Sequence, residues 1–141
     1  MNEIAMSNTA AQNAIDVLES TMRLNKSCTT DFEEYTSHYF AEGVYVREMR
    51  IPAGSVVVGK SHRYDEVCIL MHGLLMLGID GDSKIVQAPY TFTASPGKKA
   101  VYVLEDVIIA NIHPNPSNTR DLAQIEAEVM MPEYNMLEAV K

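Results

Sequence analysis

From Gly43 onward, the chain alternates short apolar runs rich in β-branched residues with glycine, proline and acidic residues. The breaks include turn signals, since Asp80-Gly81 favours a tight hairpin, Ser95-Pro96-Gly97 favours another turn and Glu105-Asp106 would separate the last two runs. Closely spaced short strands without helices between them predict an antiparallel sandwich or barrel. The runs cover residues 44–51, 56–58, 67–71, 74–79, 84–86, 90–93, 101–104 and 107–112.

Both ends of the chain carry a helical pattern instead. Apolar residues recur at spacings of three and four over residues 11–22 and again over residues 122–129, where Asn118-Thr119 would open the helix. We therefore divide the chain into an N-terminal helix with a lead-in segment, a β-barrel, and a C-terminal helix with a tail. These three parts are residues 1–42, 43–116 and 117–141.

Composition narrows the class of protein. The 141 residues carry a formal net charge of −8, which argues against binding to nucleic-acid polymers or anionic membranes. The longest apolar stretch, residues 67–79, is too short to span a bilayer, and no secretion signal opens the chain, so we expect a cytoplasmic protein. Cys28 and Cys68 form no disulfide framework, and Cys68 lies in an apolar run, where a buried thiol is expected.

A cluster of ionisable residues lies between two of the predicted strands. Lys60, His62, Arg63, Asp65 and Glu66 lie between the apolar runs 56–58 and 67–71. Because residues two apart on a strand face the same side, Lys60 and His62 can point into one cavity, with Glu66 arriving from the next strand. This turn is the first candidate for a functional site.

The spacing of this stretch resembles the first motif of the cupin superfamily, a glycine followed by two histidines, a glutamate and a second glycine. Gly54, His62, Glu66 and Gly73 fall on its register, and Lys60 stands where the first histidine is expected. The resemblance implies an antiparallel jelly roll flanked here by terminal α-helices. Of the second cupin motif only the turn glycine, Gly97, is present, and Ala100 stands at its histidine position.

The chain between residues 43 and 126 is also similar to small cupin-like proteins of tailed bacteriophages, for which no reaction is established. The resemblance implies a phage origin, and hence the host cytoplasm as the location. The shared runs are residues 43–54, 59–60, 87–91, 95–97, 104–106, 113–114 and 121–122, together with His62.

A metal site is one hypothesis for the candidate turn. His62, Glu66 and His113 would supply two imidazoles and a carboxylate, which suit a divalent transition metal such as iron, manganese, nickel or zinc. Two considerations oppose it, because a cationic Lys60 would repel the ion and His113, before Pro114 at a strand end, could equally face solvent. Without a metal, Lys60 would pair with Glu66 or Asp65, and His62 would hydrogen-bond within the pocket.

Three classes of function follow from these residues. The favoured one is a binding protein that holds a small polar or anionic ligand in the barrel through Lys60, His62, Arg63 and Tyr102, and so sequesters a host metabolite or signalling nucleotide. The second is a metal-dependent cupin enzyme, a dioxygenase or isomerase, and the third is a structural or host-interacting dimer. A homodimer is expected in each case, because the terminal helices offer apolar surface. We expect Lys98-Lys99 to be solvated and His72 to lie on the surface.

Overall fold

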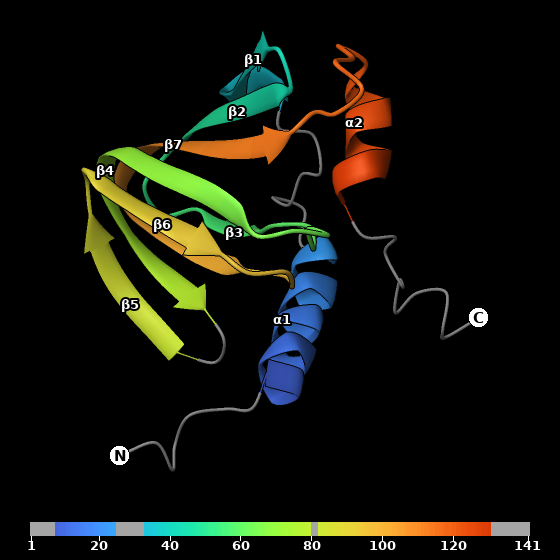
Figure 1. Cartoon of the computed structure of the whole chain (residues 1–141). Helices are drawn as coiled ribbons and strands as arrows, with labels where there is room; N and C mark the ends of the chain where they lie inside the picture. The colour runs from blue at the N-terminus through green and yellow to red at the C-terminus, as the bar shows by residue number, and fades with distance from the viewer. Residues whose placement is uncertain (1–7, 25–32, 80–81, 131–141) are drawn as a thin grey trace.

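The computed structural model describes residues 8–24, 33–79 and 82–130, and these form one curled antiparallel sheet with two α-helices (Figure 1). The predicted jelly-roll class is confirmed. The elements, in chain order, are α1 (Asn8–Arg23), η1 (Glu33–Tyr35), β1 (Thr36–Ala41), β2 (Val44–Ile51), β3 (Val56–Val58), β4 (Glu66–Ile79), β5 (Asp82–Gln87), β6 (Tyr90–Ala94), β7 (Ala100–Pro114) and α2 (Leu122–Val129).

Two long strands, β4 and β7, pair with each other and connect most of the other strands of the sheet. Each changes partner along its length: β4 pairs first with β6 and then with β5, whereas β7 pairs first with β3 and then with β2. Their mutual pairing runs through both halves, with register shifts between Leu70 and Leu75. Because β-bulges bend strands, these irregularities let one sheet fold over into two layers.

The predicted division of these strands into shorter ones is wrong. His72-Gly73 does not end a strand, because Gly73 adopts a positive φ of 93° and β4 continues through it as a bulge. Glu105-Asp106 likewise lies within β7 and does not form a hairpin turn. The surface position expected for His72 is confirmed, since its side chain is exposed.

The core lies between the two layers at the end of the barrel formed by β3, β5 and the adjoining halves of β4 and β7. Its fully buried members are apolar side chains on alternating positions of these strands. They are Leu70, Leu75, Leu77, Val86, Val103 and Val107.

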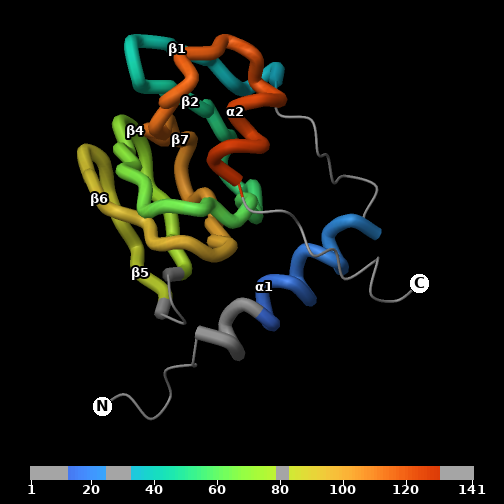
Figure 2. The backbone as a smooth tube through the Cα atoms, turned by 45° about the vertical axis from the view of Figure 1, so that its right-hand side comes forward, coloured from blue at the N-terminus to red at the C-terminus, as the bar shows by residue number. Residues whose placement is uncertain are grey.

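The opposite end of the barrel is covered by α2. Ile125 and Val129 pack with Tyr45 of β2, and both views place α2 beside β1 and β2 (Figures 1 and 2). The helix begins one turn later than expected, because the Asp121 carboxylate accepts a hydrogen bond from the backbone N–H of Ala123 and so caps it. Asn118-Thr119 precedes the helix.

The first helix, α1, lies well away from α2 (Figure 2). Its contact with the loop between β6 and β7 includes two ion pairs, in which Lys98 Nζ lies 3.2 Å from Asp16 Oδ1 and 2.6 Å from Glu19 Oε1. Neither described helix is long and apolar enough to cross a membrane.

Candidate functional site

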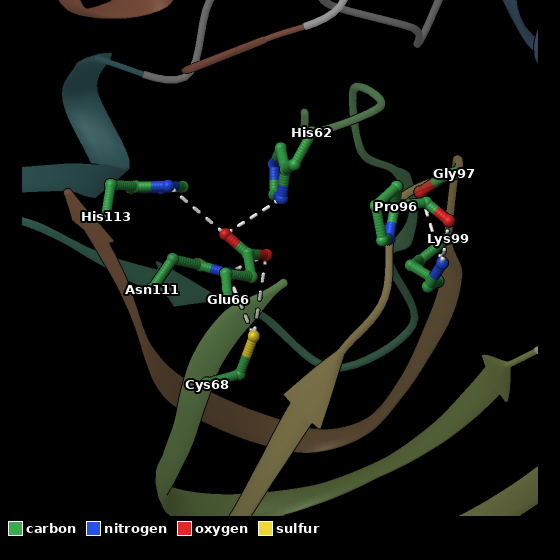
Figure 3. Close-up of polar contacts among 8 residues, drawn as sticks. All are labelled: His62, Glu66, Cys68, Pro96, Gly97, Lys99, Asn111 and His113. Atoms are coloured by element: carbon green, nitrogen blue, oxygen red, sulfur yellow. Dashed lines mark hydrogen bonds and ion pairs between the residues drawn. The ribbon is translucent and has the colours of Figure 1, made fainter. Parts of the chain in front are cut away.

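Three separate segments bring His62, Glu66 and His113 together (Figure 3). Glu66 is the first residue of β4, and His113 lies near the end of β7. Since Val67 pairs with Ile112, these two residues are neighbours across the sheet. His62 lies in the loop between β3 and β4, where its backbone forms a bridge with Met130 just after α2.

Both imidazoles contact the same carboxylate oxygen. His62 Nδ1 lies 2.8 Å and His113 Nδ1 3.2 Å from Glu66 Oε2, and the two rings meet edge to face with centroids 5.2 Å apart. The cluster is buried, since Glu66 is 6% exposed and His113 only 1%. The structure thus assembles the three residues of the predicted metal set, with His113 turned into the protein and away from solvent.

The other oxygen of Glu66 is held from deeper in the barrel. Oε1 accepts hydrogen bonds from Asn111 Nδ2 at 3.1 Å and from the Cys68 thiol at 3.5 Å. Burial and the nearby Glu66 charge raise the pKa of Cys68 to about 12, so the thiol keeps its proton. Cys68 is therefore a hydrogen-bond donor here and has no thiolate character for nucleophilic chemistry.

The charge states follow from burial and from the contacts around Glu66. Burial would raise the pKa of the Glu66 carboxyl, but the contacts with His62 and His113 and the Asn111 hydrogen bond together hold it below its usual value. Burial lowers the pKa of His113 to about 4, although Glu66 opposes this shift. At neutral pH the site therefore pairs an ionised carboxylate with a neutral imidazole at position 113.

Several buried polar atoms of this cluster lack hydrogen bonds within the described part of the chain. They are His113 Nε2, and Glu66 Oε2 and His113 Nδ1, which contact each other at 3.2 Å without the geometry of a hydrogen bond. Buried polar atoms are rarely left in this state, so each calls for an explanation. Among the described residues, no three His, Cys, Asp or Glu side chains already surround a common ion position. The donor set, two imidazoles and one carboxylate, nevertheless fits a divalent transition metal.

The other predicted ligand-binding residues lie elsewhere. Lys60 forms an ion pair with Glu126 of α2. The expectation that Lys60 pairs with Glu66 or Asp65 in the absence of a metal is therefore wrong. Arg63 is exposed, and its backbone N–H donates to the Val129 carbonyl. Of the four residues expected to bind a ligand in the barrel, His62 alone joins the buried cluster.

Tyr102 is the fourth, and it faces the outside of the sheet. Val103 beside it is fully buried in the core, and because alternate residues of a strand face opposite sides, Tyr102 points outward and is 42% exposed. The expectation that it lines the barrel is wrong because the inner face of β7 carries the odd-numbered positions here.

The two lysines after Gly97 are engaged in the fold. Lys98 pairs with α1, which corrects the expectation of a solvated side chain. Lys99 Nζ donates to the backbone oxygens of Pro96 and Gly97, at 3.5 and 3.2 Å, and so closes its own loop (Figure 3).

Sequence reasoning missed a row of inward-facing residues on β2. Tyr45 stacks on His113 with ring centroids 5.6 Å apart, and its hydroxyl lies 2.7 Å from His38 Nδ1. Arg47 follows two positions later, and Asn111 faces it from β7. The signal available in the sequence was the alternation Tyr45, Arg47, Met49, which places a charged residue on an otherwise apolar face.

No protein-family model and no curated protein matches the chain. Solved structures do match it. KdgF from a Halomonas species is 15% identical with a TM-score of 0.50, covering 70% of this chain and 94% of that one. The cupin domain of Schizosaccharomyces pombe Cnp3 is 14% identical with a TM-score of 0.50, covering 58% and 61% of the two chains.

A cupin-2 domain protein from Shewanella frigidimarina is 15% identical with a TM-score of 0.48, covering 70% of this chain and 92% of that one. At such identities a structural match shows the fold and does not transfer activity. The matches at a TM-score of 0.50, together with the strand topology, show that this chain has the cupin fold.

Proposed function

We propose that the protein binds a divalent transition metal ion inside the barrel, through His62, Glu66 and His113. The observation that carries this is the buried convergence of two imidazoles on one carboxylate oxygen: His62 Nδ1 and His113 Nδ1 lie 2.8 and 3.2 Å from Glu66 Oε2, and His113 Nε2 has no hydrogen bond to a described residue. A metal ion would bind the carboxylate oxygen and one nitrogen of each imidazole, and it requires neutral imidazole and ionised carboxylate, the forms that the pKa shifts of His113 and Glu66 favour.

Two features weaken the objections that the sequence raised. Lys60 pairs with Glu126 on α2, so its charge is partly neutralised. His113 is almost fully buried beside Glu66 and does not face solvent. In the absence of an ion the imidazoles contact Glu66 directly, and metal binding requires them to exchange that contact for one with the ion.

The activity class stays open between binding and catalysis. A bound ion would supply Lewis-acid or redox chemistry, as a cupin dioxygenase or isomerase requires. The chain itself contributes a site shielded from water, a carboxylate held in place by Asn111 and Cys68, and a neutral imidazole at position 113. Phage origin and sequestration of a host metabolite or signalling nucleotide remain predictions.

The test is elemental analysis of untagged protein after incubation with iron, manganese, nickel or zinc and removal of excess ion. We expect roughly one ion per chain in the wild type and a loss of that ion in His62→Ala and Glu66→Gln. His72→Ala is the matched control, because His72 is an exposed histidine close to the same strand pair, and it should keep the ion.

Absence of metal from the wild type after this treatment would overturn the proposal. Retention of the ion in His62→Ala and Glu66→Gln would do the same, because the ion would then lie elsewhere. Mass spectrometry of small molecules carried through purification would next test the metal-free binding protein.

A further inference from the structure

Arg47 lies on the inner face of the barrel, next to the candidate metal site. Tyr45 and Met49 on either side of it are both buried, and alternate residues of β2 share a face. Arg47 pairs with Asn111 on β7, and Asn111 pairs with Cys68 on β4. This row of residues is adjacent to the one formed by Tyr45, His113 and Glu66.

The charge of Arg47 is not balanced from within the described part of the chain. No ion pair joins Arg47 to these residues, and its Nε atom is buried without a hydrogen-bond partner. Arg50, on the outer face of the same strand, provides a contrast, because its guanidinium lies 2.9 Å from Glu48 Oε1. Arg47 is half-buried, and its guanidinium, in a chain of net charge −8, faces inward with no carboxylate partner among the described residues and is available to bind an anion.

The position of Arg47 relative to the cluster specifies where that anion would lie. The cross-strand neighbour Asn111 donates a hydrogen bond to Glu66, and Tyr45, two residues before Arg47 on β2, stacks on His113. A metal ion held by His62, Glu66 and His113 would therefore be repelled by Arg47. An anion between the two would remove this repulsion and interact with both.

We propose that the barrel binds a small oxyanion, a carboxylate or a phosphate, with Arg47 as its principal partner and the metal cluster at its other side. The inference rests on the proposed metal site. The planar guanidinium presents two parallel donors that match the two oxygens of such groups. The ligand class predicted from the sequence is kept, but Arg47 replaces Lys60, Arg63 and Tyr102 as its binding residue.

The test is calorimetric titration of the full chain, loaded with zinc and freed of excess ion, with succinate and separately with inorganic phosphate. We expect at least one probe to bind and Arg47→Gln to weaken it by at least about tenfold, or about 1.4 kcal/mol, with unchanged metal content. Arg47→Lys keeps the charge without the planar fork and should bind with intermediate affinity. Arg50→Gln, the outward-facing control, should stay within about twofold of the wild type.

Failure of the wild type to bind either probe would overturn the inference, as would wild-type affinity in Arg47→Gln. Thermal unfolding checks that Arg47→Gln folds, and if it does not, the comparison of Arg47→Lys with Arg50→Gln decides. The two proposals fail separately. If the protein takes up no metal but binds a probe through Arg47, only the metal proposal is contradicted. If the metal-loaded protein binds neither probe, only the anion proposal is contradicted.

Discussion

Glu66 is the residue on which the charges of the site converge. Its two carboxylate oxygens have different partners. Oε1 accepts hydrogen bonds from Asn111 and Cys68, whereas Oε2 contacts the imidazoles of His62 and His113. A buried carboxylate costs several kcal/mol in desolvation unless such neighbours compensate it. The lowered pKa of Glu66 shows that compensation exceeds the penalty, so the ionised form stabilises the fold.

The buried imidazole of His113 makes stability depend on pH. Its pKa falls from 6.5 when unfolded to about 4 when folded, so the unfolded chain binds the extra proton as pH drops between these values. Stability is full above pH 6.5 and declines toward pH 4, and the lowered pKa of Glu66 adds a further loss below its unfolded value. At pH 5 the protonation of His113 in the unfolded chain lowers the free energy of unfolding by about 2 kcal/mol relative to its value at high pH.

We expect metal-free His113→Phe, which keeps an aromatic ring on Tyr45, to lose less stability between pH 7 and pH 5 than the wild type. Urea denaturation at both pH values measures this difference. His72→Gln should retain the wild-type slope, because that histidine is exposed. An equal slope in His113→Phe would show that other groups control the pH dependence.

Lys60 provides a second prediction at the residue scale. Its ion pair with Glu126 is about half exposed on both sides, so Lys60→Gln should cost at most about 1 kcal/mol. Metal content and anion affinity should be unchanged, since the side chain is directed to α2. A loss of either property, measured by elemental analysis and calorimetry, would show that Lys60 contributes to the binding site.

Sequence alone identifies some of these residues and not others. His62 and Glu66 fall within one short motif, and His113 follows from the neighbouring strand expected in a jelly roll. Arg47 lies far from them along the chain, and its relevance depends on the register that pairs it with Asn111. The direction of Lys60 depends on a helix 66 residues later, which no local spacing reveals.

At the scale of elements, the bulge at Gly73 lets β4 serve both layers. The glycine has a φ of 93°, and its peptide oxygen accepts a hydrogen bond from the Ala88 N–H. A side chain there would overlap the backbone oxygen of Asp106 on β7. The two strands therefore approach closely at the point where both bend, and this approach requires glycine.

Gly73→Ala should consequently destabilise the protein by about 3 kcal/mol or more, because both the backbone angle and the overlap oppose a methyl group. Gly59→Ala is the control, since a methyl group at Gly59 meets open space, and it should stay within about 0.5 kcal/mol of wild type. Urea denaturation measures both. Equal stabilities of the two variants would mean that β4 and β7 can separate at the bulge without cost.

This bulge also explains which elements could be predicted. Strand β2 and the two helices follow from local periodicity, and the structure contains them. The sequence signals at His72-Gly73 and Glu105-Asp106 are typical of turns, but pairing between β4 and β7 carries both strands through them. Local sequence cannot distinguish a turn from a bulge, because the difference lies in whether a partner strand continues alongside.

At the scale of the whole molecule, the predicted homodimer must find its surface outside α2. Ile125 and Val129 of that helix are buried with Tyr45, and Leu122 packs against them. Helix α1 does expose Val17 and Leu18, and the outer face of the sheet also carries one apolar residue from each of four adjacent strands. In register order these are Val56 on β3, Tyr102 on β7, Met76 on β4 and Ile85 on β5.

This outer row is the surface on which we expect a second copy to pack. Val56 is 40% and Ile85 59% exposed, and exposed apolar patches of this kind are typical of interfaces. A two-fold axis would place the row against itself, so Tyr102→Glu would bring two like charges together and should convert the dimer to a monomer. Sedimentation velocity measures the change, and Tyr64→Glu, an exposed tyrosine in the loop before β4, should remain dimeric. A monomeric wild type would exclude the dimer, and a dimeric Tyr102→Glu would place its interface on another face.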